Sequence, residues 1–175
     1  GTGSFSTTTV RTGVRSFRVN PTLGSSYWQS VTLVSANVWV IRSYVRFTAL
    51  PTLTCNVLTT AHSRVPGAYF NATDSKIYAG YNDTSFIPQL GATGVAVTTG
   101  VWYRVDVKVD SSANPWTIDV QVDGAVAGQK TNATAALATT QIRLGIVQLS
   151  PTADIFYDDV AASNTAGDYP LGAGQ

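Results

Sequence analysis

The sequence contains no glutamate and no methionine, and it has only one histidine and one cysteine among its 175 residues. Every acidic residue is an aspartate, so a mechanism that needs a catalytic glutamate or a pair of imidazoles is excluded. The single Cys55 permits neither an internal disulfide nor a cysteine-based zinc site. A small buried apolar residue is the simplest role for it.

Charge is also scarce. Charged residues make up 12% of the chain, against about 25% in typical soluble domains. The formal net charge of +1 gives no electrostatic footprint for nucleic acid or anionic lipid. No apolar run approaches the length of about 18 residues that a membrane-spanning helix needs. We therefore expect neither a nucleic acid nor a membrane as a partner.

What the chain has in quantity is alternation of apolar and polar residues. From residue 101 to residue 110, valine or tyrosine occupies every odd position, while Arg104, Asp106 and Lys108 stand between them. The same period of two returns over residues 116–123, and the Asp123-Gly124 pair that ends this stretch predicts a hairpin turn. Such a period is typical of strands with one face in the core and one face in water.

The pattern predicts about ten strands and almost no helix. We expect strands at residues 14–19, 27–34, 39–47, 53–60, 68–72, 76–81, 101–110, 116–122, 125–127, 141–147 and 155–162. Residues 132–139 are rich in alanine but lack an amphipathic stripe, so a loop or one helical turn is expected there. The fold class is therefore an all-β sandwich over residues 14–163. Residues 1–13 form a connector or a first edge strand, and residues 164–175 form a second connector.

Three phrases carry a resemblance to a known family. Residues 99–105 (TGVWYRV), followed by residues 118–124 (IDVQVDG), resemble paired strands of laminin-G-like and concanavalin-A-like modules. Residues 155–160 (IFYDDV) are similar to the last strand of that superfamily. The resemblance implies a two-sheet antiparallel jelly-roll sandwich of the lectin and glucanase type.

The C-terminal residues 168–174 are similar to the exit from such modules in phage structural proteins and bacterial surface proteins. This implies a non-catalytic recognition or structural module of a larger phage-particle or bacterial surface protein. The expected location is extracellular or on the virion surface. The expected partners are a glycan or protein surface, or neighbouring subunits of a particle.

A polar face is the main candidate for ligand contact. Arg42, Tyr44 and Arg46 alternate along one strand, and they combine with Arg104 and Asp106 if the two strands share the concave sheet. Guanidinium forks and an aromatic ring at this spacing suit hydroxyl or carboxylate recognition, although a salt-bridged solvated sheet explains the same residues. Loops near His62 and Tyr81 complete the predicted binding surface. His62 alone cannot form a catalytic triad, so a structural or exposed role is expected for it.

The alternative function is a polysaccharide hydrolase or lyase. Glucanases of the resembled family use a strand motif with two glutamates, and this motif is absent. Asp106 and Asp119 lie on the predicted wet faces of neighbouring strands and could in principle act as acid and base. Two solvated surface aspartates are the simpler interpretation.

Asp154, Asp158 and Asp159 cluster on the last predicted strand, and carboxylates of this kind suit Ca²⁺. The resemblance implies that an aspartate in this phrase helps to hold a structural calcium ion near the N-terminal strand. The alternative is that Asp158 accepts hydrogen bonds from backbone N–H groups or from an arginine. No other cofactor is expected to be required.

The tryptophans are expected mostly in the core. Trp39 and Trp116 fall on the dry sides of their strands, and the resemblance implies a core position for Trp102. Trp28 is the best candidate for an exposed sugar platform.

Overall fold

The computed structural model describes residues 2–22, 27–62, 64–132, 138–147 and 151–172. Within these ranges it contains thirteen strands and one short 3₁₀ helix: β1 (Thr2–Ser6), β2 (Ser16–Asn20), β3 (Tyr27–Ala36), β4 (Val38–Ala49), β5 (Cys55–Thr60), β6 (Gly67–Asn71), β7 (Lys76–Asn82), β8 (Pro88–Ala96), β9 (Trp102–Asp110), β10 (Trp116–Val122), β11 (Ala125–Asn132), β12 (Thr139–Ile146), β13 (Asp154–Ser163) and η1 (Ala166–Asp168). In the described part of the chain, no helix is long or apolar enough to cross a membrane.

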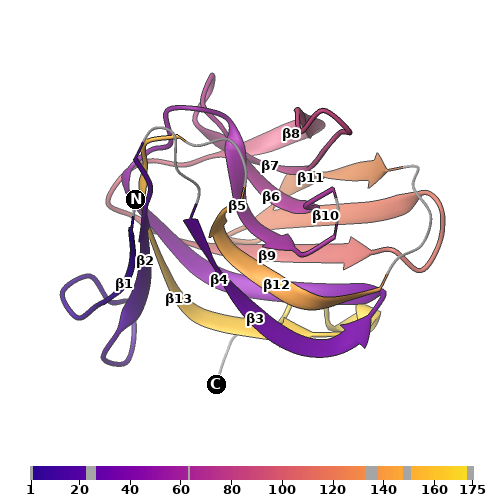
Figure 1. Ribbon diagram of the computed structural model, residues 1–175, viewed down its shortest axis with the longest axis horizontal. Helices are drawn as coiled ribbons and strands as arrows, with labels where there is room; N and C mark the ends of the chain where they lie inside the picture. Colours follow the sequence, from indigo (N-terminus) through magenta and orange to yellow (C-terminus); the bar gives the residue numbers. More distant parts are fainter. Residues whose placement is uncertain (1, 23–26, 63, 133–137, 148–150, 173–175) are drawn as a thin grey trace.

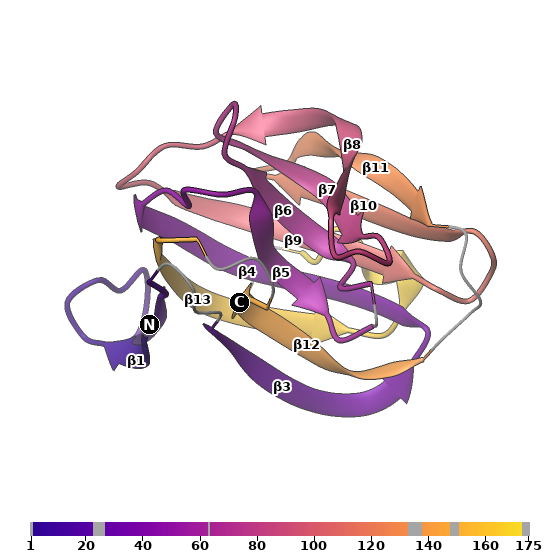
Figure 2. The same cartoon turned by 45° about the horizontal axis from the view of Figure 1, so that its top comes forward.

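The strands form two stacked sheets (Figure 1). One sheet has seven strands in the order β1-β2-β13-β4-β9-β10-β11, and the other has six strands in the order β3-β12-β5-β6-β7-β8. Figure 2 shows the same two layers from another side, with β3 and β12 side by side below β13 and β4 in the view. Neighbouring strands are antiparallel, which confirms the predicted jelly-roll sandwich.

The core lies between the two sheets and is built from the alternating apolar residues. Ile41, Val45 and Phe47 of β4 and Val105 and Val107 of β9 are fully buried in it. Cys55 belongs to the same cluster, as expected, and burial raises the pKa of its thiol. Burial of these side chains on one face of β4 and β9 directs the residues between them to the opposite face.

The strand β8 was not predicted. Its sequence, PQLGATGVA, contains two glycines and one proline, so it lacks the apolar alternation of the other strands. The strand β11 is also longer than predicted, since it continues from Ala125 to Asn132. Residues 2–6 form the edge strand β1, paired with β2.

β8 and β11 approach each other closely where the two sheets meet. A Cβ atom on Gly128 of β11 would lie 2.8 Å from the backbone oxygen of Thr93 in β8, and Gly128 has a φ of +109°. Both the backbone conformation and the close approach therefore require a glycine at this position.

Replacing Gly128 with alanine should destabilise the protein by about 1–3 kcal/mol, because the new methyl group would push β8 away from β11. Gly124→Ala is the matched control in the same hairpin: its φ is +81°, but a Cβ atom there meets nothing within 4 Å. Urea unfolding of the two variants measures the difference. Equal losses of stability would show that the contact with Thr93 does not matter.

Candidate functional site

The predicted polar face exists, and it is the face of the seven-stranded sheet that points away from the core. The register of β4 and β9 pairs Arg46 with Trp102, Tyr44 with Arg104, and Arg42 with Asp106. Directly opposed residues of antiparallel strands share one face and lie close together. The five predicted residues of the two strands are thus brought together. We call this surface the outer polar face.

One row of the outer polar face alternates cations and aromatic rings across four strands. Arg18 of β2 pairs with Phe156 of β13, Phe156 pairs with Arg46 of β4, and Arg46 pairs with Trp102 of β9. The Arg18 guanidinium lies 5.4 Å from the centre of the Phe156 ring and forms a bidentate ion pair with Asp154. We call Arg18, Phe156, Arg46 and Trp102 the cation–aromatic row.

The position of Trp102 corrects an expectation. The resemblance implied a core tryptophan, but the next residue, Tyr103, packs against the core, so Trp102 points outward and is half-buried. The signal was present in the sequence, since Trp102 has the same parity as Arg104 and Asp106. Phe156 likewise lies on the outer side of the sheet, between the core residues Ile155 and Tyr157, but it is only 4% exposed.

Asp106 is not on a wet face, as the alternation predicted, but is 0% exposed. The Arg104 Nε atom lies 2.7 Å from an Asp106 carboxylate oxygen. Burial raises the pKa of Asp106, while the hydrogen bond and charge of Arg104 lower it. Arg42, its cross-strand neighbour, is only 5% exposed. A salt-bridged solvated sheet therefore does not describe this part of the face.

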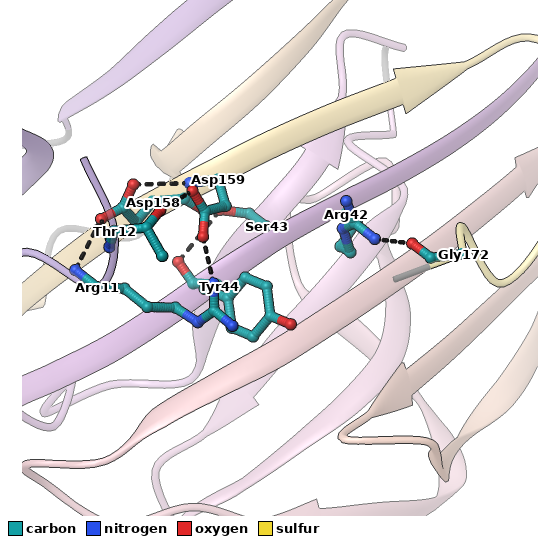
Figure 3. Close-up of polar contacts among 8 residues, drawn as sticks. All are labelled: Arg11, Thr12, Arg42, Ser43, Tyr44, Asp158, Asp159 and Gly172. Carbon is teal, nitrogen blue, oxygen red and sulfur yellow. Dashed lines mark hydrogen bonds and ion pairs between the residues drawn. The ribbon is translucent and has the colours of Figure 1, made fainter. Parts of the chain in front are cut away.

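The cover over these charges is the chain's own C-terminal segment. Residues 166–172, which we call the C-terminal strap, follow β13 and pass over the outer polar face. The carbonyl oxygen of Leu171 accepts hydrogen bonds from Arg42 and Arg104, and that of Gly172 accepts another from Arg42 (Figure 3). The segment predicted as a connector is thus bound to two of the predicted ligand-binding residues.

Tyr169 of the C-terminal strap lies near the carboxylates of the sheet. Burial raises the pKa of its hydroxyl, and the charges of Asp119 and Asp106 raise the pKa further. Among the residues that the structure describes, this buried hydroxyl has no hydrogen-bond partner.

Tyr44 is covered from the other end of the chain. The Arg11 guanidinium lies 3.4 Å from the centre of the Tyr44 ring, and Arg11 also pairs with Asp159 (Figure 3). The N-terminal loop between β1 and β2 therefore occupies one face of the ring.

Asp158 and Asp159 bind this same loop. Asp158 accepts hydrogen bonds from the backbone N–H groups of Arg11 at 2.8 Å, Thr12 at 3.3 Å and Asp159 at 2.8 Å. The Asp159 carboxylate accepts hydrogen bonds from the side chains of Arg11 and Thr12. Asp154 faces Arg18 and Thr48 instead.

The contacts of Asp158 are those of the alternative to calcium, in which it accepts hydrogen bonds from backbone N–H groups. N–H and guanidinium donors, rather than a shared opening, face the carboxylate oxygens, whereas calcium needs six to eight oxygen ligands. The described residues include no group of three or more His, Cys, Asp or Glu side chains that could hold a metal ion. The calcium hypothesis stays a prediction.

The structure places His62 and Tyr81 away from the outer polar face. His62 is 2% exposed: its Nδ1 lies 2.7 Å from the Thr60 hydroxyl and its ring packs on Trp116 at 4.7 Å. Because its side chain is buried, the prediction that His62 contacts a ligand is wrong. Tyr81 lies in β7 of the other sheet and packs against the core, with Lys130 above its ring. The side chain of Trp28 lies outside the described residues.

Asp106 and Asp119 do share the outer polar face. The register pairs Asp106 with Gln121 and Asp119 with Lys108, so the two carboxylates are diagonal neighbours on β9 and β10. Gln129 donates a hydrogen bond of 2.7 Å to Asp119. Burial of Asp106 under the C-terminal strap leaves only Asp119 accessible in this arrangement.

No known protein-family model matches the sequence, and no curated protein matches it. Solved structures of similar fold include the receptor-binding domain of botulinum neurotoxin type G, with a TM-score of 0.60 and 9% identity over 91% of this chain and 40% of that one. The carbohydrate binding module CBM66 from Bacillus subtilis has a TM-score of 0.58 and 9% identity over 92% and 91% of the two chains. The alginate lyase Aly36B has a TM-score of 0.54 and 12% identity over 86% and 81%.

These identities are low, so the likeness concerns the fold alone. The chain spans less than half of the neurotoxin domain but almost all of the carbohydrate binding module. The fold is therefore that of jelly-roll modules that occur both as binding domains and as enzymes.

The raised pKa of Asp106 predicts a pH dependence of stability. As pH rises above the ordinary value of 3.8, the unfolded chain ionises Asp106 before the folded chain does, so its contribution to stability decreases through the folded pKa. Asp106→Asn removes this effect. The stability of the variant relative to the parent should therefore be higher at pH 7 than at pH 3.5, as measured by urea unfolding. A difference that does not change with pH would contradict the burial effect.

Addition of a chelator tests the calcium hypothesis. Because protein donors face the Asp158 and Asp159 oxygens, we expect the melting temperature to stay the same in excess EDTA. A fall in melting temperature that added Ca²⁺ reverses would instead establish a structural ion.

Proposed function

We propose that this chain is a non-catalytic glycan-recognition module of a larger phage-particle or bacterial surface protein, at an extracellular or virion surface. The observation that carries this proposal is the cation–aromatic row. Its four residues come from four strands distant in sequence, yet the sheet register aligns them on one surface.

The chemistry of the row suits a sugar chain. The half-buried Trp102 ring offers a rigid and amphipathic contact area, whereas Phe156 is buried beside it, and guanidinium groups donate several hydrogen bonds from a planar fork. The Arg18 side chain is 41% exposed, and Trp102 and Arg46 are half-buried, so a ligand can reach them. The Nε atom of Arg46 has no hydrogen-bond acceptor among the described residues. A ligand that uncovers the Arg46 Nε atom can therefore accept a hydrogen bond from it.

The structural neighbours support the proposal at the level of the fold. They include one protein described as a carbohydrate binding module and one described as a receptor-binding domain, and their sandwich can therefore carry recognition. The neighbours also include sialidases and an alginate lyase, so the fold does not decide whether the chain is an enzyme.

The environment of Asp106 favours binding over catalysis. A glycosidic acid must reach the oxygen of the scissile bond. Asp106 is ion-paired with Arg104 and covered by the C-terminal strap, and His62 is in the core. A hydrolase or lyase that uses Asp106 and Asp119 remains the alternative, and it predicts measurable cleavage of a polysaccharide.

Replacing Trp102 with alanine should weaken glycan binding by about 5- to 150-fold, because loss of an aromatic stacking contact removes about 1–3 kcal/mol, the range found for nucleic-acid bases stacked on aromatic side chains. A glycan array finds the ligand, and isothermal titration measures the affinities of parent and variant. Phe86→Ala is the control, since Phe86 is a 52% exposed aromatic residue in the loop between β7 and β8.

Three results would contradict the proposal. Equal losses in the two variants would show that the row is not the binding surface. Cleavage of the bound glycan by the parent, lost in Asp106→Asn, would favour the enzyme. Absence of glycan binding, together with a native particle in which a neighbouring subunit covers the outer polar face, would indicate a purely architectural module.

A further inference from the structure

The C-terminal strap satisfies the charges below it only in part. It offers Arg42 and Arg104 the carbonyl oxygens of Leu171 and Gly172, which carry partial charges. The Nε atom of Arg42 is buried and has no acceptor within the described residues. Among the described residues, no acceptor faces this edge of the Arg42 fork, and a missing hydrogen bond is costly for a buried charged group.

The two guanidinium groups at this place, those of Arg42 and Arg104, share one direct carboxylate partner, Asp106. Two further carboxylates are nearby but have other partners: Asp119 accepts a hydrogen bond from Gln129, and Asp123 accepts one from the backbone N–H of Arg104. A second carboxylate between the two guanidinium groups would complement them better than neutral carbonyl groups do.

Besides the hydrogen bonds of Leu171 and Gly172 with the two arginines and one from Ser163 to Asp168, the C-terminal strap has few contacts with the sheet. Residues 166–168 and 172 are exposed, and a Cβ atom on Gly167 or Gly172 would meet no atom within 4 Å. The buried Tyr169 hydroxyl has no partner in the described part of the chain, which destabilises the docked position. Few contacts must therefore be broken to lift the strap from the sheet.

We propose that the C-terminal strap occupies the carboxylate subsite of the glycan-binding face, and that a glycan bearing sugar carboxylates displaces it to bind Arg42 and Arg104. This inference rests on the proposed glycan recognition and adds the class of ligand and its competitor. The carbonyl oxygens of Leu171 and Gly172 mark where the carboxylate oxygens bind.

The distance between the two parts of the face sets the size of the ligand. Arg46 and Arg42 are four residues apart on β4, which corresponds to about 13–14 Å along a strand. A ligand that contacts the cation–aromatic row and the carboxylate subsite together must therefore be an extended chain of several sugar units. A single uronic acid reaches only one of the two.

Titration of uronate trisaccharides against the parent and Tyr169→Ala tests the proposal. The probes are the trisaccharides of galacturonate, glucuronate and mannuronate, and their methyl esters serve as neutral controls of the same shape. Tyr169→Ala removes the partly buried ring that packs the strap on the sheet, so the strap competes less, and this variant should bind at least one acid about tenfold more tightly than the parent does. The esters should bind both proteins equally.

Substitution of Arg104 separates charge from geometry. Arg104→Gln should lose the preference for the acid over its ester. Arg104→Lys keeps a cation beside Asp106 but loses the planar fork, so it should weaken binding of the acid less than Arg104→Gln does. If Arg104→Gln fails to fold, the lysine variant alone tests the role of the planar fork. If Arg104→Lys prefers the acid over its ester as strongly as the parent does, the fork has no role.

A spin label on the C-terminal strap reports displacement directly. Gly167→Cys places a thiol at an exposed position, while the native Cys55 is fully buried and should not be labelled. The nitroxide spectrum should sharpen when the acid trisaccharide binds and stay the same with its ester. Tight binding of the acid without a change in the spectrum would overturn displacement.

The outcomes separate this inference from the proposed function. If a neutral glycan binds through Trp102 while no acid binds more tightly than its ester, the carboxylate subsite is wrong and glycan recognition stands. If no glycan of either kind binds the parent or Tyr169→Ala, both are wrong.

Discussion

The register between β4 and β9 is the constraint on which the rest of the structure depends. It places Ile41, Val45 and Phe47 in the core and, by the same alternation, presents Arg42, Tyr44 and Arg46 on the opposite face. A slip of one residue would exchange the two sets and bury three polar side chains between the sheets. The hydrophobic core and the candidate binding surface are therefore two consequences of a single strand pairing.

The alternation of apolar and polar residues predicted the sandwich and most of its strands, because a strand with one buried face has an apolar residue at every second position. It missed β8, whose glycines and proline hide that period. It also placed Asp106 in water, because alternation indicates which face a residue joins but not what later covers that face. The cover is a segment more than sixty residues away, and Leu171 carries no signal that it binds Arg104. The outward position of Trp102 followed from parity alone, but the family resemblance pointed the other way.

Both ends of the sandwich sequence fold back onto the same sheet, and they do so in different ways. The N-terminal loop is held by several backbone N–H groups and by the Arg11 pair with Asp159, so its acceptors and donors are well matched. The C-terminal strap leaves the Arg42 Nε and the Tyr169 hydroxyl unpaired among the described residues. The contrast indicates a lasting attachment at the N-terminal end and an exchangeable one at the C-terminal end, on adjacent rows of the same sheet.

The place of β13 affects how the chain reaches this structure. The last strand in sequence lies between β2 and β4, two of the earliest, so the seven-stranded sheet consists of two separate parts until residues 154–163 arrive. During synthesis, the edges of β2 and β4 that pair with β13 stay unpaired while more than a hundred residues emerge from the ribosome. Pairing of strands so far apart in sequence makes folding slow and leaves aggregation-prone intermediates. The yield of soluble protein should therefore depend on chaperones, even if the folded protein is stable.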